Sequence, residues 1–139
     1  DERVVELGGP VDPQGQLKPM TGIYDIKGGH GTVEACREVL ARVGHPAGLC
    51  HFHVGWFQDT LPTVETGPIA ILRLDGDWYA STKVCLDHLY DRVTPGGFVV
   101  IDDYLTFEGC QLAVDEFRSE RGILEPLTAI DVNAVWWRR

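Results

Sequence analysis

Four carboxylates follow two short apolar segments, and their spacing is the strongest chemical signal in the sequence. Asp75 and Asp77 come directly after the apolar run 69–74, and Asp102 and Asp103 come after a second run that begins at residue 98. Two such strands in a parallel sheet would end side by side at the carboxyl edge, where open α/β sheets bind ligands. Crowded carboxylates repel one another unless a cation or a shared proton offsets the charge. The pattern therefore predicts a hard-metal site on an α/β sheet.

The same acids have simpler interpretations. Asp75 and Asp77 precede an expected helix, and an aspartate that caps a helix N-terminus stabilises it by about 1 kcal/mol. Asp103 could orient a ligand rather than bind the ion itself. The arrival of a second acidic pair at the end of the next strand favours the metal site over helix capping.

Alternating apolar runs and helical periodicity surround these acids. We expect helices and strands in turn, with helices at 32–43, 79–92 and 108–121 and strands at 49–54, 69–74, 98–102, 123–130 and 134–138. The run 69–74 is apolar except for Arg73, which predicts burial on both faces of the sheet. The segment 69–102 reads as a parallel βαβ unit, and the last two strands as an antiparallel edge.

The 139 residues allow one domain at most, which we divide into a loop-rich lead-in over 1–31 and an α/β core over 32–139. A doubly wound sheet normally opens with a strand, a Gly-rich turn and a helix. No such unit precedes residue 49. We therefore expect the chain to be the later part of a longer, Rossmann-like domain.

Composition excludes several classes of partner. The net charge is -9 and the pI is about 4.8, so neither nucleic acid nor an anionic membrane is an expected partner. No apolar run approaches the roughly 20 residues of a membrane span. The four cysteines form no C-x-x-C pair, which is typical of reduced thiols in a cytoplasmic protein. Apolar surface left by a missing upstream part would favour a homo-oligomer.

Several motifs occur together in a recognisable order. They are 54–62 (VGWFQDTLP), 72–79 (LRLDGDWY) followed by Ser81 and Thr82, 94–104 (TPGGFVVIDDY) and 134–139 (AVWWRR). In order and spacing they resemble the macrocin O-methyltransferase family over roughly residues 50–139. The family's Gly-rich cofactor segment and its acidic ribose-binding residue lie upstream of everything present here.

The resemblance implies a class I, Rossmann-like methyltransferase that uses S-adenosyl-L-methionine (AdoMet) and magnesium, or manganese, to methylate a sugar hydroxyl in antibiotic biosynthesis. It implies that Asp75, Asp102 and Asp103 bind the metal and that Asp77 is the general base. The expected partner is a small sugar-containing substrate.

A cofactor contact is also expected from the loop that follows the strand at 49–54. That strand should neighbour the cofactor crevice, so Gly55, Trp56 and Phe57, together with Asp75, are the candidate cofactor-binding residues. Trp56 or Phe57 could stack on adenine, although core packing is the competing interpretation.

The proposed chemistry suits these residue types. A sugar hydroxyl is a very weak acid, and a divalent metal bound to it lowers its pKa and fixes its direction. Asp77 would then take the proton while the methyl group is transferred in line.

Two other enzyme classes also place D-x-D after an apolar strand. In haloacid dehalogenase-type phosphotransferases and phosphatases, Asp75 would be a nucleophile and Asp77 an acid/base, but Tyr79 stands where a threonine is usual. In metal-dependent glycosyltransferases, the motif holds a nucleotide-sugar diphosphate, which leaves Asp102 and Asp103 unexplained.

Overall fold

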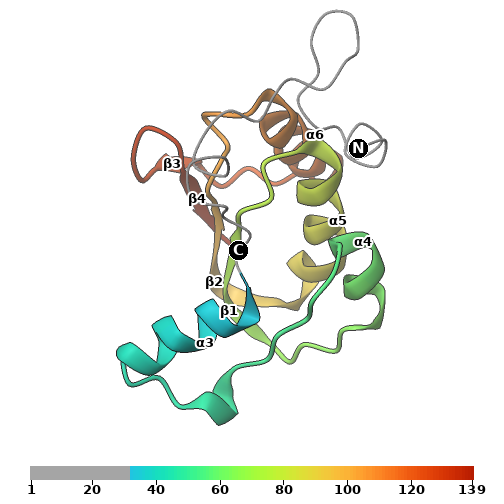
Figure 1. Ribbon diagram of the computed structural model, residues 1–139. Coiled ribbons are helices and arrows are strands. Elements are labelled where there is room, and N and C mark those ends of the chain that lie inside the picture. The colour runs from blue at the N-terminus through green and yellow to red at the C-terminus, as the bar shows by residue number, and fades with distance from the viewer. Residues whose placement is uncertain (1–31) are drawn as a thin grey trace, which may run out of the picture.

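The computed structural model describes residues 32–139, which build a mixed four-stranded sheet with helices against one face (Figure 1). The strand order is β1-β2-β4-β3, and the strands are β1 (Ile69–Leu74), β2 (Val93–Ile101), β3 (Thr128–Ala129) and β4 (Val135–Arg138). β1 and β2 are parallel, whereas β4 is antiparallel to both β2 and β3. The predicted βαβ unit and the antiparallel edge are thus confirmed.

The three predicted helices are present, and a short fourth helix, α4 (Phe57–Thr60), lies where no helix is predicted. The others are α3 (Val33–Arg42), α5 (Tyr79–Leu89) and α6 (Glu108–Arg121), with short 3-10 turns at η1 (Ala47–Leu49), η2 (Leu61–Thr63) and η3 (Tyr90–Arg92). The Thr32 hydroxyl accepts a hydrogen bond from the Ala35 N–H at 3.1 Å and so caps α3. Gly122, with φ 62°, ends α6. Within the described chain, none of these helices has the length and apolarity that a membrane crossing requires.

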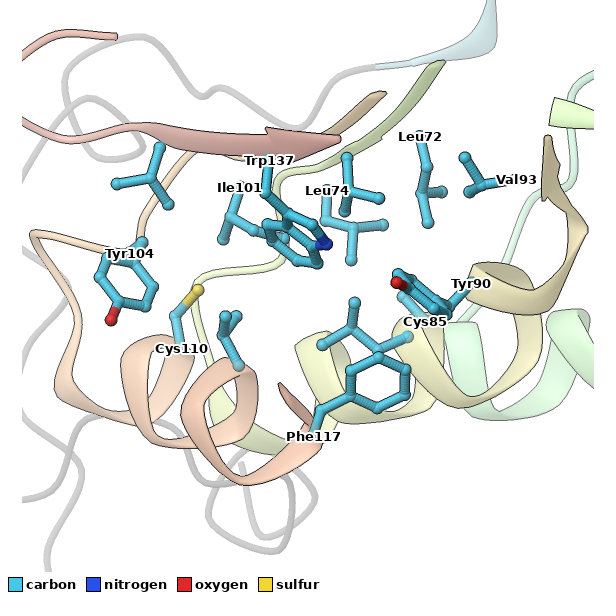
Figure 2. Close-up of a cluster of buried hydrophobic side chains, with 14 residues drawn as sticks. Leu72, Leu74, Cys85, Tyr90, Val93, Ile101, Tyr104, Cys110, Phe117 and Trp137 are labelled. Atoms are coloured by element: carbon cyan, nitrogen blue, oxygen red, sulfur yellow. The ribbon is translucent and has the colours of Figure 1, made fainter. Parts of the chain in front are cut away.

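The core lies between the sheet and the pair α5 and α6 (Figure 2). Tyr90 meets the edge of the Phe117 ring at 5.1 Å and stacks on Trp137 at 6.4 Å. Such aromatic pairs add roughly 0.5–1.5 kcal/mol beyond burial of their surface. Burial raises the pKa of the Cys85 thiol to about 12, so this cysteine acts as a small apolar side chain.

The opposite face of the sheet is more open than the sequence predicts. Leu72 and Leu74 are buried toward the helices, but Ile71, directly before Leu72 in β1, is 64% exposed. Phe98 and Trp136 contact each other on this second face at 5.4 Å and are only partly buried. The expected burial of β1 on both faces is therefore wrong within residues 32–139, because the described helices cover one face only.

The strand predicted at 49–54 is absent. Residues 50–54 have no regular structure, and Leu49 and Val54 are 69% and 77% exposed. A strand needs a neighbour to take its backbone hydrogen bonds, and no described strand pairs with this segment. An apolar pattern alone does not supply that neighbour.

Two strand boundaries also differ from prediction. Of the strand expected at 123–130, only Thr128–Ala129 forms. Pro126 has no N–H to donate to a neighbouring strand, and the carbonyl of Glu125 accepts a hydrogen bond from the Arg118 guanidinium instead. β2 begins at Val93 rather than 98. The residues before 98 are held by the end of the chain, where the backbone N–H of Arg139 donates a hydrogen bond to the Gly97 carbonyl at 2.9 Å.

Gly97 occupies the tightest backbone contact in this region. The β1–β2 register slips between Ile69 and Ile71, and a Cβ on Gly97 would lie 2.8 Å from Val93 Cγ1 and 2.9 Å from the Ala70 carbonyl oxygen. No side chain fits there without moving backbone.

Gly97→Ala should therefore lower the free energy of unfolding by about 1–3 kcal/mol, the usual cost of overpacking. Urea denaturation measures this loss. Gly48→Ala is the matched control, because a Cβ at Gly48 meets no atom within 4 Å. Equal stability of the two variants would contradict the assigned contact.

Candidate functional site

The two acidic pairs meet because β1 and β2 end together. Leu74 and Ile101 are register partners, and the Asp102 N–H donates to the Leu74 carbonyl at 2.9 Å. This last bond of the ladder ties the two strand ends together. The predicted convergence of acids at the carboxyl edge of the sheet is confirmed.

Three of these acids form a compact group of possible metal ligands. Asp75, Asp77 and Asp103 each offer a carboxylate oxygen, and these oxygens lie within 4.8 Å of one another. An all-oxygen donor set suits Mg²⁺ or Mn²⁺ rather than a soft metal. The donor set therefore fits the metal that the sequence predicts.

Asp77 holds an unusual backbone conformation that shapes this group. Its φ is 57°, in the left-handed region, which aspartate tolerates better than most residues. Its N–H donates to Asp103 Oδ2 at 3.3 Å. The backbone N–H of Asp77 thus holds the carboxylate of Asp103 in place. Residues with strained backbone conformations of this kind cluster at functional sites.

The crowding of charge changes the proton affinity of two acids. Burial, followed by repulsion from Asp77 and Asp75, raises the pKa of Asp103 to about 6. Burial and the charge of Asp75 likewise raise the pKa of Asp77. The N–H of Asp77 only partly offsets the effect on Asp103. Without a cation, the site thus favours a proton.

Asp102 is not part of the three-acid group. Its Oδ1 lies 2.8 Å from Arg73 Nη2, and Arg73 Nη1 lies 3.0 Å from Asp75 Oδ2. The guanidinium bridges the two strand ends and neutralises part of their charge. Because these side chains are about half exposed, the bridge adds little to stability. The role of Asp102 as a metal ligand stays a prediction.

The helix-capping interpretation of Asp75 and Asp77 loses its support. The N-cap position of α5 is Trp78, and no side chain caps it within the described chain. The Ser81 hydroxyl donates to the carbonyls of Gly76 and Trp78. Neither Asp75 nor Asp77 therefore acts as the cap of α5.

A cavity of about 230 Å³ adjoins the acids. It brings together residues from α4 and the loop before it and from α5 and the turn before it, namely Gly55, Trp56, Phe57, Gln58, Asp75, Gly76, Asp77, Trp78 and Ser81. All the predicted cofactor-binding residues therefore line one cavity. Their cofactor role is not tested by this placement.

The loop geometry at the mouth of this cavity requires glycine. Gly55 has φ 143°, and a Cβ there would lie 3.1 Å from Thr60 Cγ2. The turn brings Trp56 and Phe57 toward the acids. Sequence reasoning missed Gln58, Gly76, Trp78 and Ser81 as cavity residues, and the available signal was their position in or directly after the motifs at 54–62 and 72–79.

The raised pKa of Asp103 predicts a distinct pH dependence of the metal-free protein. Its folded pKa of about 6 exceeds the ordinary 3.8, so the folded state binds the extra proton between about pH 4 and 6. Stability from this group is therefore present at low pH and is lost as pH rises through 6. Because solvent screens part of this effect, we expect Asp103 to change the free energy of unfolding by on the order of 1 kcal/mol over this pH range.

Asp103→Asn should remove this dependence and make the metal-free protein more stable at pH 7. Thermal unfolding in chelator at pH 4.5 and pH 7 measures it, with Asp87→Asn on α5 as the control carboxylate. Parallel pH profiles for wild type and Asp103→Asn would rule the effect out.

Curated proteins of known activity are similar in sequence to this chain. A curated relative from Streptomyces olivaceus, 8-demethyl-8-(2,3-dimethoxy-alpha-L-rhamnosyl)-tetracenomycin-C 4'-O-methyltransferase, is 44% identical over 92% of this chain and 47% of its own length. Mycinamicin III 3''-O-methyltransferase from Micromonospora griseorubida is 38% identical over 94% of this chain and 50% of its own. The chain spans about half the length of these curated relatives.

The fold has a solved counterpart. The structure of the O-methyltransferase NovP aligns with a TM-score of 0.74 and 40% identity, covering 78% of this chain and 45% of that one. The macrocin-O-methyltransferase (TylF) family matches residues 32–139, which include every strand and every acid described above. The chain belongs to the macrocin-O-methyltransferase family.

Proposed function

We propose that the protein is an AdoMet-dependent and magnesium-dependent O-methyltransferase that acts on a sugar hydroxyl of a glycosylated natural product or of a nucleotide-sugar. Its relatives are named for methylation of such molecules. The proposed setting is a cytoplasmic homo-oligomer with a complete Rossmann-like domain, of which this chain contributes the later strands.

The observation that carries the proposal is the three-acid group beside the cavity. Asp75 and Asp77 belong to both. A metal-dependent methyltransferase of hydroxyl groups needs a cation site next to the site of the methyl donor, and the three-acid group and the cavity share these two residues. A structural acidic turn would require no adjoining cavity.

Asp75, Asp102 and Asp103 would hold the metal, with Asp102 drawn from its ion pair with Arg73. When bound, the ion supplies acidification of a coordinated sugar hydroxyl. Asp77 would take the proton from that hydroxyl, because its carboxylate lies beside those of Asp75 and Asp103 and lines the cavity. Trp56 and Phe57 line the cavity.

Magnesium titration by calorimetry tests the cation site. Wild type should bind Mg²⁺, and Asp75→Asn should weaken binding by more than about tenfold, because it replaces a charged ligand with a neutral one. Asp87→Asn, on the exposed side of α5, should bind as wild type. Equal affinity in all three proteins would remove the metal site.

Substitution of the proposed base separates catalysis from binding. Asp77→Asn should lower the rate of methyl transfer to a rhamnosyl glycoside by roughly 10²–10⁴-fold, the usual contribution of a general base, while affinity for Mg²⁺ stays near that of wild type. Single-turnover transfer of a labelled methyl group measures it. An unchanged rate would assign proton removal to another group.

A further inference from the structure

Arg73 is a charged residue in a strand whose other residues are apolar, and the proposed function assigns it no task. β1 has the sequence IAILRL, with Arg73 next to last. Because side chains alternate across a strand, Arg73 lies on the sheet face opposite to the buried Leu72 and Leu74. Its side chain is 53% exposed and contacts the acids at the carboxyl edge of the sheet. A cation in this position acts directly on the proposed metal site.

The Arg73 guanidinium holds one acid from each of the two strand ends. Nη1 lies 3.0 Å from Asp75 Oδ2, and Nη2 lies 2.8 Å from Asp102 Oδ1. A guanidinium can bridge two carboxylates because its donors diverge in a rigid plane, whereas a lysine ammonium is a point charge. Both carboxylates belong to the proposed set of metal ligands. One cation of the protein therefore engages two of the three side chains that the metal would use.

The direction of the Asp102 side chain reflects this contact. Within residues 32–139, the carboxylate oxygens that gather within 4.8 Å of one another come from Asp75, Asp77 and Asp103, and Asp102 is outside the group. Its carboxylate pairs with Arg73 instead. A divalent ion that binds Asp102 must take this carboxylate from the guanidinium, and two cations at such short range repel each other. Arg73 and the metal therefore compete for Asp102.

The two ion pairs are weak enough to be exchanged. The side chains of Asp75 and Asp102 are 51% and 37% exposed, and ion pairs in contact with water contribute little net stability. Such pairs offset part of the repulsion between the acids in the metal-free protein. They also yield readily to a divalent ion, which carries twice the charge and binds several carboxylates at once.

We propose that Arg73 is a resident counter-cation of the metal site, which holds Asp75 and Asp102 in the metal-free protein and releases Asp102 when the metal binds. The inference rests on the proposed function. Arg73 is then a positioning residue that lowers the affinity for the metal, because its charge competes with the ion. The competing interpretation is that Arg73 orients both acids for the metal, and it predicts the opposite effect on affinity.

Calorimetric titration of Mg²⁺ into Arg73→Met distinguishes these two roles. Methionine keeps a long, unbranched side chain but carries no charge. Removal of the competing charge should raise the affinity for Mg²⁺ roughly five- to thirtyfold relative to wild type. Arg42→Met is the matched control, because Arg42 is 79% exposed at the end of α3, and this variant should bind as wild type. Weaker or unchanged affinity in Arg73→Met would overturn the inference.

A variant that retains the charge separates competition from a folding defect. Arg73→Lys should bind Mg²⁺ with an affinity near that of wild type, because a lysine still competes for the acids. Thermal unfolding adds a readout that needs neither substrate nor turnover. In chelator, Arg73→Met should melt below wild type, since the carboxylates then repel one another without the guanidinium. At one fixed Mg²⁺ concentration, its melting temperature should rise by more than that of wild type, because stabilisation by a ligand grows with affinity. A smaller rise would contradict the exchange.

Failure of this inference and failure of the proposed function give different results. If wild type binds Mg²⁺, Asp75→Asn binds it weakly and Arg73→Met binds it as wild type does, the metal site stands and the exchange is overturned. If neither wild type nor Arg73→Met binds Mg²⁺, the proposed metal site is contradicted, and this inference with it.

Discussion

The parallel pairing of Leu74 with Ile101 is the constraint on which the candidate site depends. Each strand has its own acidic end, and neither end would be a site alone. The pairing is enforced by burial, because both residues pack into the core against α5 and α6. The hydrophobic face of the sheet thus fixes the separation of carboxylates that it never touches, and an error of one residue in register would turn the acids to opposite faces.

Electrostatic repulsion at this edge is managed rather than avoided. Arg73 compensates the charge of Asp75 and Asp102, the Asp77 N–H compensates part of the charge of Asp103, and the proton affinity of Asp103 rises. None of these contributions fully neutralises the negative charge of the acids. The residual negative potential gives the free protein a lasting attraction for a cation, which is consistent with the proposed methyltransferase chemistry and with its charged methyl donor.

Local sequence patterns predict those elements whose packing partners lie within residues 32–139. The predicted bounds of α6, 108–121, are those observed, because helical periodicity reports burial directly. The prediction of a strand at 49–54 is wrong, because a strand depends on a neighbouring strand that its own sequence does not specify. Likewise the four aspartates were placed correctly at one edge, but the direction of Asp102 toward Arg73 depends on a side-chain choice that spacing does not encode.

The left-handed backbone at Asp77 also limits which sequences this turn can accept. A side chain there must tolerate a positive φ, which restricts the position to glycine, asparagine and aspartate at low cost. Of these three, only aspartate is a proton acceptor. The backbone therefore restricts residue 77 independently of catalysis: in a library randomised at this position, most variants would lose roughly 1–2 kcal/mol of stability. A proton acceptor of another type, in place of the proposed base, would require a different turn.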